Sequence, residues 1–184
     1  INRPIQSAFA PGSIYKIITA LTALEHGMNA HETVNCTGQT YLHGTLRRCW
    51  LEKEHGKINL KNSIKHSCNI MFYNIGALCK NDLFIKVGKE LCIGESFDKF
   101  DFQKQNIGIN PNDAWKRKNL KEPWYPGDNV NLSIGQGFVK TNALQLAVMM
   151  ARIASLGKKV EPTLKPVITA PEFEEININS AFLK

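Results

Sequence analysis

Ser13 stands three residues before Lys16, in an apolar stretch that reads FAPGSIYKIITALTALEHG over residues 9–27. A serine hydroxyl becomes an effective nucleophile only when a base takes its proton, and residues three apart on a helix share a face. A lysine can be that base when burial lowers its pKa, and the backbone N–H of Ser13 at a helix start can stabilise an oxyanion. On spacing alone, a capping serine beside a solvated lysine is the commoner explanation.

A second polar cluster stands in HSCNIMFYNIG, residues 66–76, where Ser67 and Asn69 flank Cys68. A serine hydroxyl can relay a proton, and an asparagine amide can hold a substrate amide by hydrogen bonds. A helix-capping serine with an asparagine nearby is the ordinary structural alternative. The two clusters are candidate halves of one acyl-transfer site.

Cys36, Cys49, His55 and Cys68 form a third candidate group, separated by twelve, five and twelve residues. Three thiolates and one imidazole complete the tetrahedron of a structural Zn²⁺ and leave no open position. Such an ion would also fix the segment around Cys68, between Ser67 and Asn69. Because the spacing lacks a short C-x₂-C signature, a disulfide and free thiols remain alternatives. The other two cysteines, at positions 79 and 92, fall on predicted helical faces and are expected in the core.

The elements that must position these residues are mostly helical. Apolar residues at helical spacing predict a helix over 13–26, which Pro11-Gly12 precedes and Gly27 ends. Residues 28–58 show no regular pattern, and residues 94–130 are expected to form a long ordered loop with short elements. Further helices are expected from the cap Asn59 to about 66, over 68–79, over 82–92, and from the cap Thr141 to about 156, with Gly157 closing the last. The best strand candidate is 159–169.

Composition sets the broad class of the protein. The chain has 184 residues, 43% of them hydrophobic, a formal net charge of +7 and a pI near 9.2. These values are typical of an ordinary globular chain that is one domain or a piece of one. The basic residues are spread along the sequence rather than gathered in one block, which favours a mildly basic surface over nucleic-acid binding. No run of about 18 apolar residues predicts a membrane span.

The motifs together resemble a known family. NRPIQSAFAPGSIYK, HSCNIMFY and residues 121–164 look like the transpeptidase domain of class B penicillin-binding proteins, and most like the elongation-type penicillin-binding protein 2. The family typically reads W-x-x-G-D, then G-Q-G, then T-P-x-Q at a helix start. The matching positions here are Trp124, Gly127, Asp128, Gly135, Gln136, Gly137, Thr141, Ala143 and Gln145.

The resemblance implies a serine D,D-transpeptidase that cross-links peptidoglycan stem peptides and is acylated by β-lactams. Ser13 would be the nucleophile, Lys16 its general base and Ser67 a proton relay, with Asn69 contacting the substrate. Members of the family also show Cys, R-x-R-C-W, H-G and S-C-[ND] in this order, which supports zinc at Cys36, Cys49, His55 and Cys68. The chemistry itself needs no cofactor. The resemblance further implies the periplasmic face of the bacterial inner membrane and partners in a cell-wall elongation complex.

The implied fold is α+β, namely the predominantly helical part of the β-lactamase-like transpeptidase fold with much of its central antiparallel sheet missing. We expect a partial transpeptidase domain over 1–184, with a nucleophile helix at 13–26, a Cys/His-rich region at 28–58, a second-motif helix region at 59–79, and G-Q-G with its following helix at 131–157. The family's Lys-Thr-Gly strand is not found, since KTN at residues 140–142 precedes a predicted helix. We therefore expect a fragment, with its membrane anchor upstream and little activity alone.

Other classes of protein make different predictions. A non-catalytic β-lactam sensor would keep Ser13 and Lys16 but fail to resolve the acyl-enzyme. A serine β-lactamase needs a deacylating water and a base that the sequence does not reveal. A zinc-stabilised nucleic-acid binder would show salt-dependent binding, and it ranks last because no clustered basic face with interleaved aromatics is present.

Overall fold

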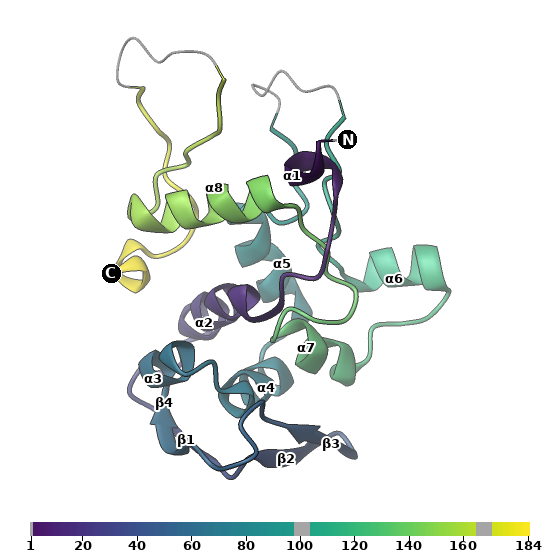
Figure 1. The fold of residues 1–184 in the computed structure, drawn as a ribbon, viewed down its shortest axis with the longest axis vertical. Coiled ribbons are helices and arrows are strands. Elements are labelled where there is room, and N and C mark those ends of the chain that lie inside the picture. Colours follow the sequence, from purple (N-terminus) through teal and green to yellow (C-terminus); the bar gives the residue numbers. More distant parts are fainter. Residues whose placement is uncertain (1, 98–103, 165–170) are drawn as a thin grey trace.

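Helix α2 (Lys16–Glu25) lies at the centre of the structure, a computed structural model that describes residues 2–97, 104–164 and 171–184 (Figure 1). Seven of its ten residues are buried. The predicted helix over 13–26 is split, because a 3-10 turn, η1 (Gly12–Tyr15), comes first and the α-helix begins only at Lys16. Gly12 has a φ of +58°, which turns the chain sharply after Pro11 and favours the tighter 3-10 winding.

Helices α3, α4 and α5 pack against α2, and α7 packs against α4. Residues of α2, α4, α5 and α8 share one core, formed among others by Ile18, Leu21, Phe72, Phe84 and Met149. The other helices are α1 (Arg3–Gln6), α3 (Leu60–Lys65), α4 (Asn69–Leu78), α5 (Asn81–Glu90), α6 (Asp113–Leu120), α7 (Pro126–Leu132), α8 (Ala143–Ala154) and the 3-10 turn η2 (Ser180–Leu183). None of these helices is long and apolar enough to cross a membrane.

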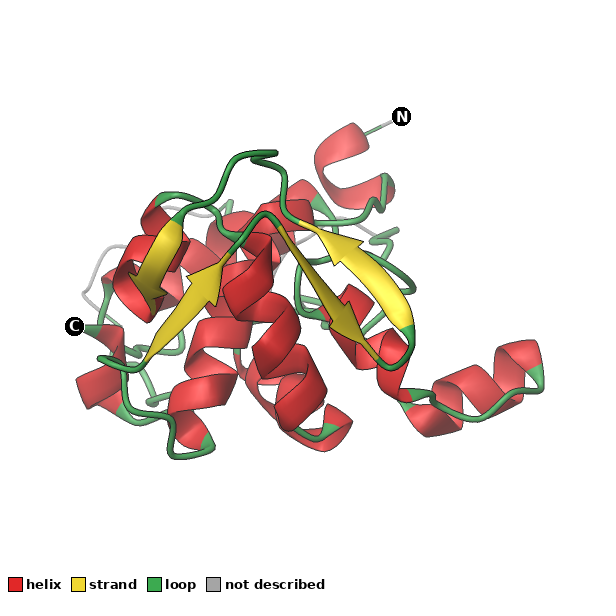
Figure 2. Cartoon of the chain, turned by 90° about the horizontal axis from the view of Figure 1, so that it is seen from below, coloured by secondary structure: helices red, strands yellow, loops and turns green. Residues whose placement is uncertain are grey.

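Four short strands lie within residues 33–59, although the sequence predicted that residues 28–58 are irregular. Strand β1 (Thr33–Cys36) pairs antiparallel with β4 (Gly56–Asn59), and β2 (Gln39–Leu42) pairs antiparallel with β3 (Thr45–Arg48). They lie on one side of the helices (Figure 2). The prediction was wrong because each strand has four residues and is largely exposed, which leaves little apolar alternation. His43 and Gly44 both have positive φ and close the β2–β3 hairpin.

The predicted helix starts are confirmed at one position and shifted at another. The side chain of Asn59 caps α3 by accepting from the Asn62 N–H at 3.0 Å. Helix α8 is capped by Asn142 rather than by the predicted Thr141, and Asn142 forms a reciprocal capping box with Gln145. Thr141 is buried and donates its hydroxyl to the Gln145 side chain instead.

The segment 94–130 was expected to be a long loop with short elements, and its described part contains helix α6 and most of helix α7, which ends at Leu132. Residues 98–103 lie outside the described part. The strand expected over 159–169 is not found in its described portion, where an isolated bridge between Lys158 and Glu175 is the nearest pairing. Its residues 165–169 lie outside the described ranges.

Candidate active site

Lys16 and the turn between α3 and α4 form the centre of the candidate site. The ammonium of Lys16 donates to the Ser67 backbone oxygen at 2.8 Å, to Ser67 Oγ at 2.8 Å and to Asn69 Oδ1 at 2.7 Å. Lys16 is only 2% exposed. The three residues that the sequence assigned to base, relay and substrate contact are therefore joined by direct hydrogen bonds.

Ser13 joins this group through Ser67. The hydroxyl of Ser67 donates to Ser13 Oγ at 3.0 Å, and Ser13 is exposed. The resemblance made Lys16 the general base and Ser67 a proton relay, and the Ser67 hydroxyl is hydrogen-bonded to both Lys16 and Ser13. Because hydroxyl protons rotate freely, the same row of atoms can carry a proton from Ser13 toward Lys16.

The backbone at Ser67 explains how this side chain reaches Lys16. Helix α3 ends in a Schellman motif, in which the Cys68 N–H donates to the Ser63 carbonyl and the Ser67 N–H donates to the Ile64 carbonyl. Ser67 takes the left-handed position of this motif with a φ of +52°, where glycine is usual.

The environment of Lys16 lowers its pKa from 10.5 to about 8, chiefly because burial disfavours the ammonium. The nearby thiols of Cys49 and Cys68 act in the opposite direction. The Phe72 ring centroid lies 5.4 Å from Nζ and forms part of the apolar wall. A fraction of Lys16 is therefore neutral near physiological pH, as a general base must be.

The Gly135-Gln136-Gly137 turn supports the segment that carries Ser13. The Gly12 N–H donates to the Gly135 carbonyl at 3.0 Å, and the Thr19 hydroxyl donates to the Ser133 carbonyl at 2.8 Å. A Cβ at Gly135 would collide with the carbonyl oxygen of Gly12. Sequence reasoning noted this turn only through family resemblance and missed Thr19 and Ser133, since a buried threonine in an apolar helix gives no signal of its partner.

The KTN segment is excluded as an active-site strand. Lys140 and Thr141 form isolated bridges to Ile109 and Phe9, and Asn142 caps α8. The two sheets formed by the described residues both come from strands within residues 33–59, so neither includes the KTN segment.

The structure gathers the predicted metal ligands into one cluster. The ligand atoms of Cys36, Cys49, His55 and Cys68 all lie within 4.8 Å of one another. His55 Nδ1 lies 3.4 Å from Cys36 Sγ and 3.6 Å from Cys49 Sγ. Tetrahedral Zn²⁺ with these donors requires separations of about 3.5–3.8 Å. Burial, aided by His66 and Lys16, lowers the pKa of His55, which favours the neutral imidazole that binds metals.

This Cys/His cluster contacts the acyl-transfer residues directly. The Asn69 N–H points to Cys49 Sγ at 3.4 Å, and the Asn69 side-chain amide donates to the Arg48 carbonyl at 3.4 Å. The Trp50 indole donates to the His66 carbonyl at 3.0 Å. These contacts connect the Cys/His cluster to the segment 67–69, as the sequence predicted. The other two cysteines, Cys79 and Cys92, are buried as expected, each just after a helix.

A family model for the penicillin-binding protein transpeptidase domain matches residues 1–180. The chain belongs to this family. It is 30% identical over 164 residues to the peptidoglycan D,D-transpeptidase MrdA of Acinetobacter baumannii, covering 88% of this chain and 24% of the relative. A MrdA of Salmonella typhimurium is 29% identical over 89% of this chain and 27% of the relative. The chain thus spans about a quarter of the length of these curated relatives.

Solved structures confirm the fold and the resemblance to penicillin-binding protein 2. PBP2 of Helicobacter pylori, solved in a complex with MreC, matches with a TM-score of 0.90 and 27% identity, covering all of this chain and 34% of that one. A structure of a peptidoglycan synthase complex that coordinates polymerization and crosslinking matches with a TM-score of 0.88 and 30% identity, covering all of this chain and 32% of that one. The α+β fold class is therefore confirmed.

Proposed function

We propose that this domain catalyses D,D-transpeptidation of peptidoglycan stem peptides through an acyl-enzyme on Ser13. The observation that carries the proposal is the hydrogen-bonded row of Lys16, Ser67 and Ser13. An exposed nucleophile, a relay hydroxyl and a buried amine of lowered pKa are the parts that serine acyl transfer requires.

The reaction has two balanced steps. Ser13 Oγ bonds to the carbonyl carbon of the penultimate D-alanine, and its proton passes through Ser67 to neutral Lys16. The bond to the terminal D-alanine breaks, and the leaving amine takes the proton back. An amine of a second stem peptide then attacks the ester, gives up a proton, and restores the Ser13 hydroxyl. Asn69 orients the substrate amide.

The test uses a protein that contains residues 1–184 with the sequence that flanks them in the gene. A fluorescent penicillin should label it at a peptide containing Ser13, and Ser13→Ala should abolish the label. Absence of label, or label that persists in Ser13→Ala, would contradict the proposal. The same assay on residues 1–184 alone tests the expectation that this piece reacts poorly.

The reaction products distinguish a transpeptidase from two other serine-based proteins, a β-lactam sensor and a β-lactamase. A transpeptidase releases D-alanine from a stem-peptide analogue and joins the acyl group to an added amine. A β-lactam sensor stays acylated and releases no D-alanine, whereas a β-lactamase hydrolyses penicillin repeatedly. No contact among the described residues specifically favours either alternative.

We also propose that Cys36, Cys49, His55 and Cys68 hold a structural Zn²⁺. The separations around His55 and the burial of the three cysteines support it. A bound zinc would supply no chemistry to the reaction and would fix the backbone that carries Ser67 and Asn69. Metal analysis should find one zinc per chain in the wild type and in Cys79→Ala, and none in Cys36→Ala. Equal zinc in all three, or none in the wild type, would contradict this.

We further propose that the domain works at the periplasmic face of the bacterial inner membrane within a cell-wall elongation complex. The Helicobacter pylori relative solved with MreC supports a partner of this kind. Co-purification of the full protein with the MreC homologue of the same cell would test it, and a full protein found only in the cytoplasmic fraction would contradict it.

A further inference from the structure

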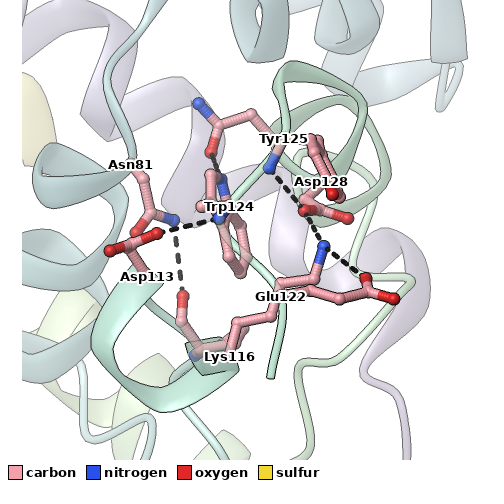
Figure 3. Close-up of polar contacts among 9 residues, drawn as sticks. Asn81, Asp113, Lys116, Glu122, Trp124, Tyr125 and Asp128 are labelled. Carbon is pink, nitrogen blue, oxygen red and sulfur yellow. Dashed lines mark hydrogen bonds and ion pairs between the residues drawn. The ribbon is translucent and has the colours of Figure 1, made fainter. Parts of the chain in front are cut away.

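Lys116 is a buried cation outside the acyl-transfer site. It lies on α6, is 2% exposed, and donates to Asp128 Oδ2 at 2.6 Å (Figure 3). The Glu122 carboxylate lies 3.6 Å from Nζ on the other side. The ammonium also lies 4.3 Å from the Tyr125 ring centroid and 5.3 Å from that of Phe138.

This arrangement fixes both ends of the segment 126–138. Asp128 lies in the first turn of α7, where its Oδ2 also accepts from the Tyr125 N–H at 2.8 Å. Phe138 directly follows the Gly135-Gln136-Gly137 turn, and its ring also contacts Trp115 on α6 at a centroid distance of 5.6 Å. One ammonium therefore holds the start of α7 and the residue after the turn, by a charged hydrogen bond and by cation–π contact.

The segment between these two points supports the nucleophile. Asn129 donates to the Cys79 carbonyl at 2.9 Å, which ties α7 to the end of α4. Ser133 accepts from Thr19, and Gly135 accepts from the Gly12 N–H next to Ser13. A shift of the segment would thus move the turn on which Ser13 sits.

A buried ion pair is a weak source of stability, because desolvation offsets much of the attraction and an apolar replacement of both partners is often neutral. A cation held by a carboxylate and two aromatic rings does fix relative positions. The contacts of Lys116 therefore account for the relative positions of α6, Asp128 and Phe138 better than they account for the stability of the fold.

We propose that Lys116 is a positioning residue for acylation of Ser13, acting through Asp128 and Phe138 on the segment 126–138. This inference rests on the proposed function. It assigns no contact with substrate to Lys116, whose effect reaches Ser13 through the Gly135–Gly12 hydrogen bond.

The test measures acylation by a penicillin, resolved into the dissociation constant of the encounter complex and the rate constant of the chemical step. In the protein with its native flanking sequence, Lys116→Met should slow the chemical step about tenfold with little change in the dissociation constant, as expected for a displaced nucleophile. Lys118→Met, an exposed lysine on the same helix, is the matched control and should react as the wild type does.

The double variant Lys116→Met/Asp128→Asn separates positioning from stability. It leaves no unpaired buried carboxylate, and the introduced amide oxygen can still accept from the Tyr125 N–H, so its melting temperature should recover toward the wild type. Its chemical step should remain slow. A chemical step that recovers with the melting temperature, or one that is unchanged in Lys116→Met, would overturn the inference. A wild type that penicillin does not acylate at Ser13 would overturn the proposed function first, and this inference with it.

Discussion

The hydroxyls of Ser13 and Ser67 lie 3.0 Å apart, and Lys16 hydrogen-bonds to the same Ser67 hydroxyl. A base that acts through a second hydroxyl depends on the position of that hydroxyl. In this chain the position is set by the left-handed backbone at Ser67, which ends α3 and starts the approach to α4. The strained backbone and the proposed proton relay are therefore properties of the same residue.

Replacing Ser67 separates these two properties. Ser67→Gly and Ser67→Ala both remove the relay hydroxyl and one hydrogen-bond acceptor of the buried Lys16 ammonium. Only glycine also relieves the positive φ, so Ser67→Gly should be more stable than Ser67→Ala by about 1 kcal/mol. Both should slow acylation at least about 100-fold. Thermal unfolding and penicillin labelling measure the two effects.

Leu156 supplies the control for this comparison. It has a φ of +57° just after the end of α8, is 48% exposed, and is not one of the candidate acyl-transfer residues. Leu156→Gly should raise the melting temperature without changing the acylation rate. Full acylation by Ser67→Gly would show that the Ser67 hydroxyl does not carry the proton.

The pKa of Lys16 predicts how acylation depends on pH. Because only neutral Lys16 can accept a proton, the rate should rise as pH increases through about 8 and level off above it. Lys16→Met should abolish the reaction at every pH. A rate that is flat between about pH 6 and 9 in the wild type would contradict the assignment of Lys16 as the base.

The same shift links stability to pH. The unfolded chain keeps the Lys16 proton up to its ordinary pKa of 10.5, while the folded chain loses it near 8. Between these values the unfolded state binds more protons, so the contribution of Lys16 to stability rises with pH. Below about 8 both states are protonated and the full penalty of burying the ammonium remains. Unfolding of wild type and Lys16→Met should converge as pH rises from 8 toward 10.5.

The buried hydroxyl of Tyr15 predicts a stabilising substitution. Tyr15 is 0% exposed, and its hydroxyl has no hydrogen-bond partner among the described residues. Removing an unpaired buried polar group relieves its desolvation penalty, so Tyr15→Phe should stabilise the fold by about 1 kcal/mol. Tyr73→Phe is the control, because the Tyr73 hydroxyl donates to the Arg48 carbonyl at 3.5 Å and its loss should not stabilise. Chemical denaturation measures both, and a destabilised Tyr15→Phe would contradict the prediction.

Local patterns were sufficient to predict most of the helices around the candidate site. The apolar spacing after Pro11-Gly12 indicated α2, and Asn59 indicated the start of α3, because both signals lie within a few residues of the element they define. The grouping of Cys36, Cys49, His55 and Cys68 rested on residue type and on the family resemblance, because their spacing in the sequence is not that of a short metal-binding motif.

The missed features all depend on tertiary contacts. Strands β1–β4 are too short and too exposed to show alternation, and they are held by pairing and by the Cys/His cluster. The resemblance made Ser67 a proton relay, but the left-handed backbone at Ser67 could not be read from a serine in the sequence. Lys116 looks like any surface lysine on α6 until Asp128, Tyr125 and Phe138 surround it.

Gly135 tests whether the support beneath Ser13 is steric as well as hydrogen-bonded. Gly135→Ala places a Cβ against the Gly12 carbonyl and 2.7 Å from Tyr15 Cβ, so the nucleophile turn must move. Gly27→Ala is the matched control, since Gly27 also has positive φ but has open space around its Cβ position. Both variants should lose about 1 kcal/mol from the left-handed backbone. Only Gly135→Ala should lose further stability and, in its folded fraction, slow penicillin acylation at least about tenfold, because a displacement near 1 Å is enough to misalign a nucleophile. Equal acylation by the two variants would show that Ser13 keeps its position without this close approach.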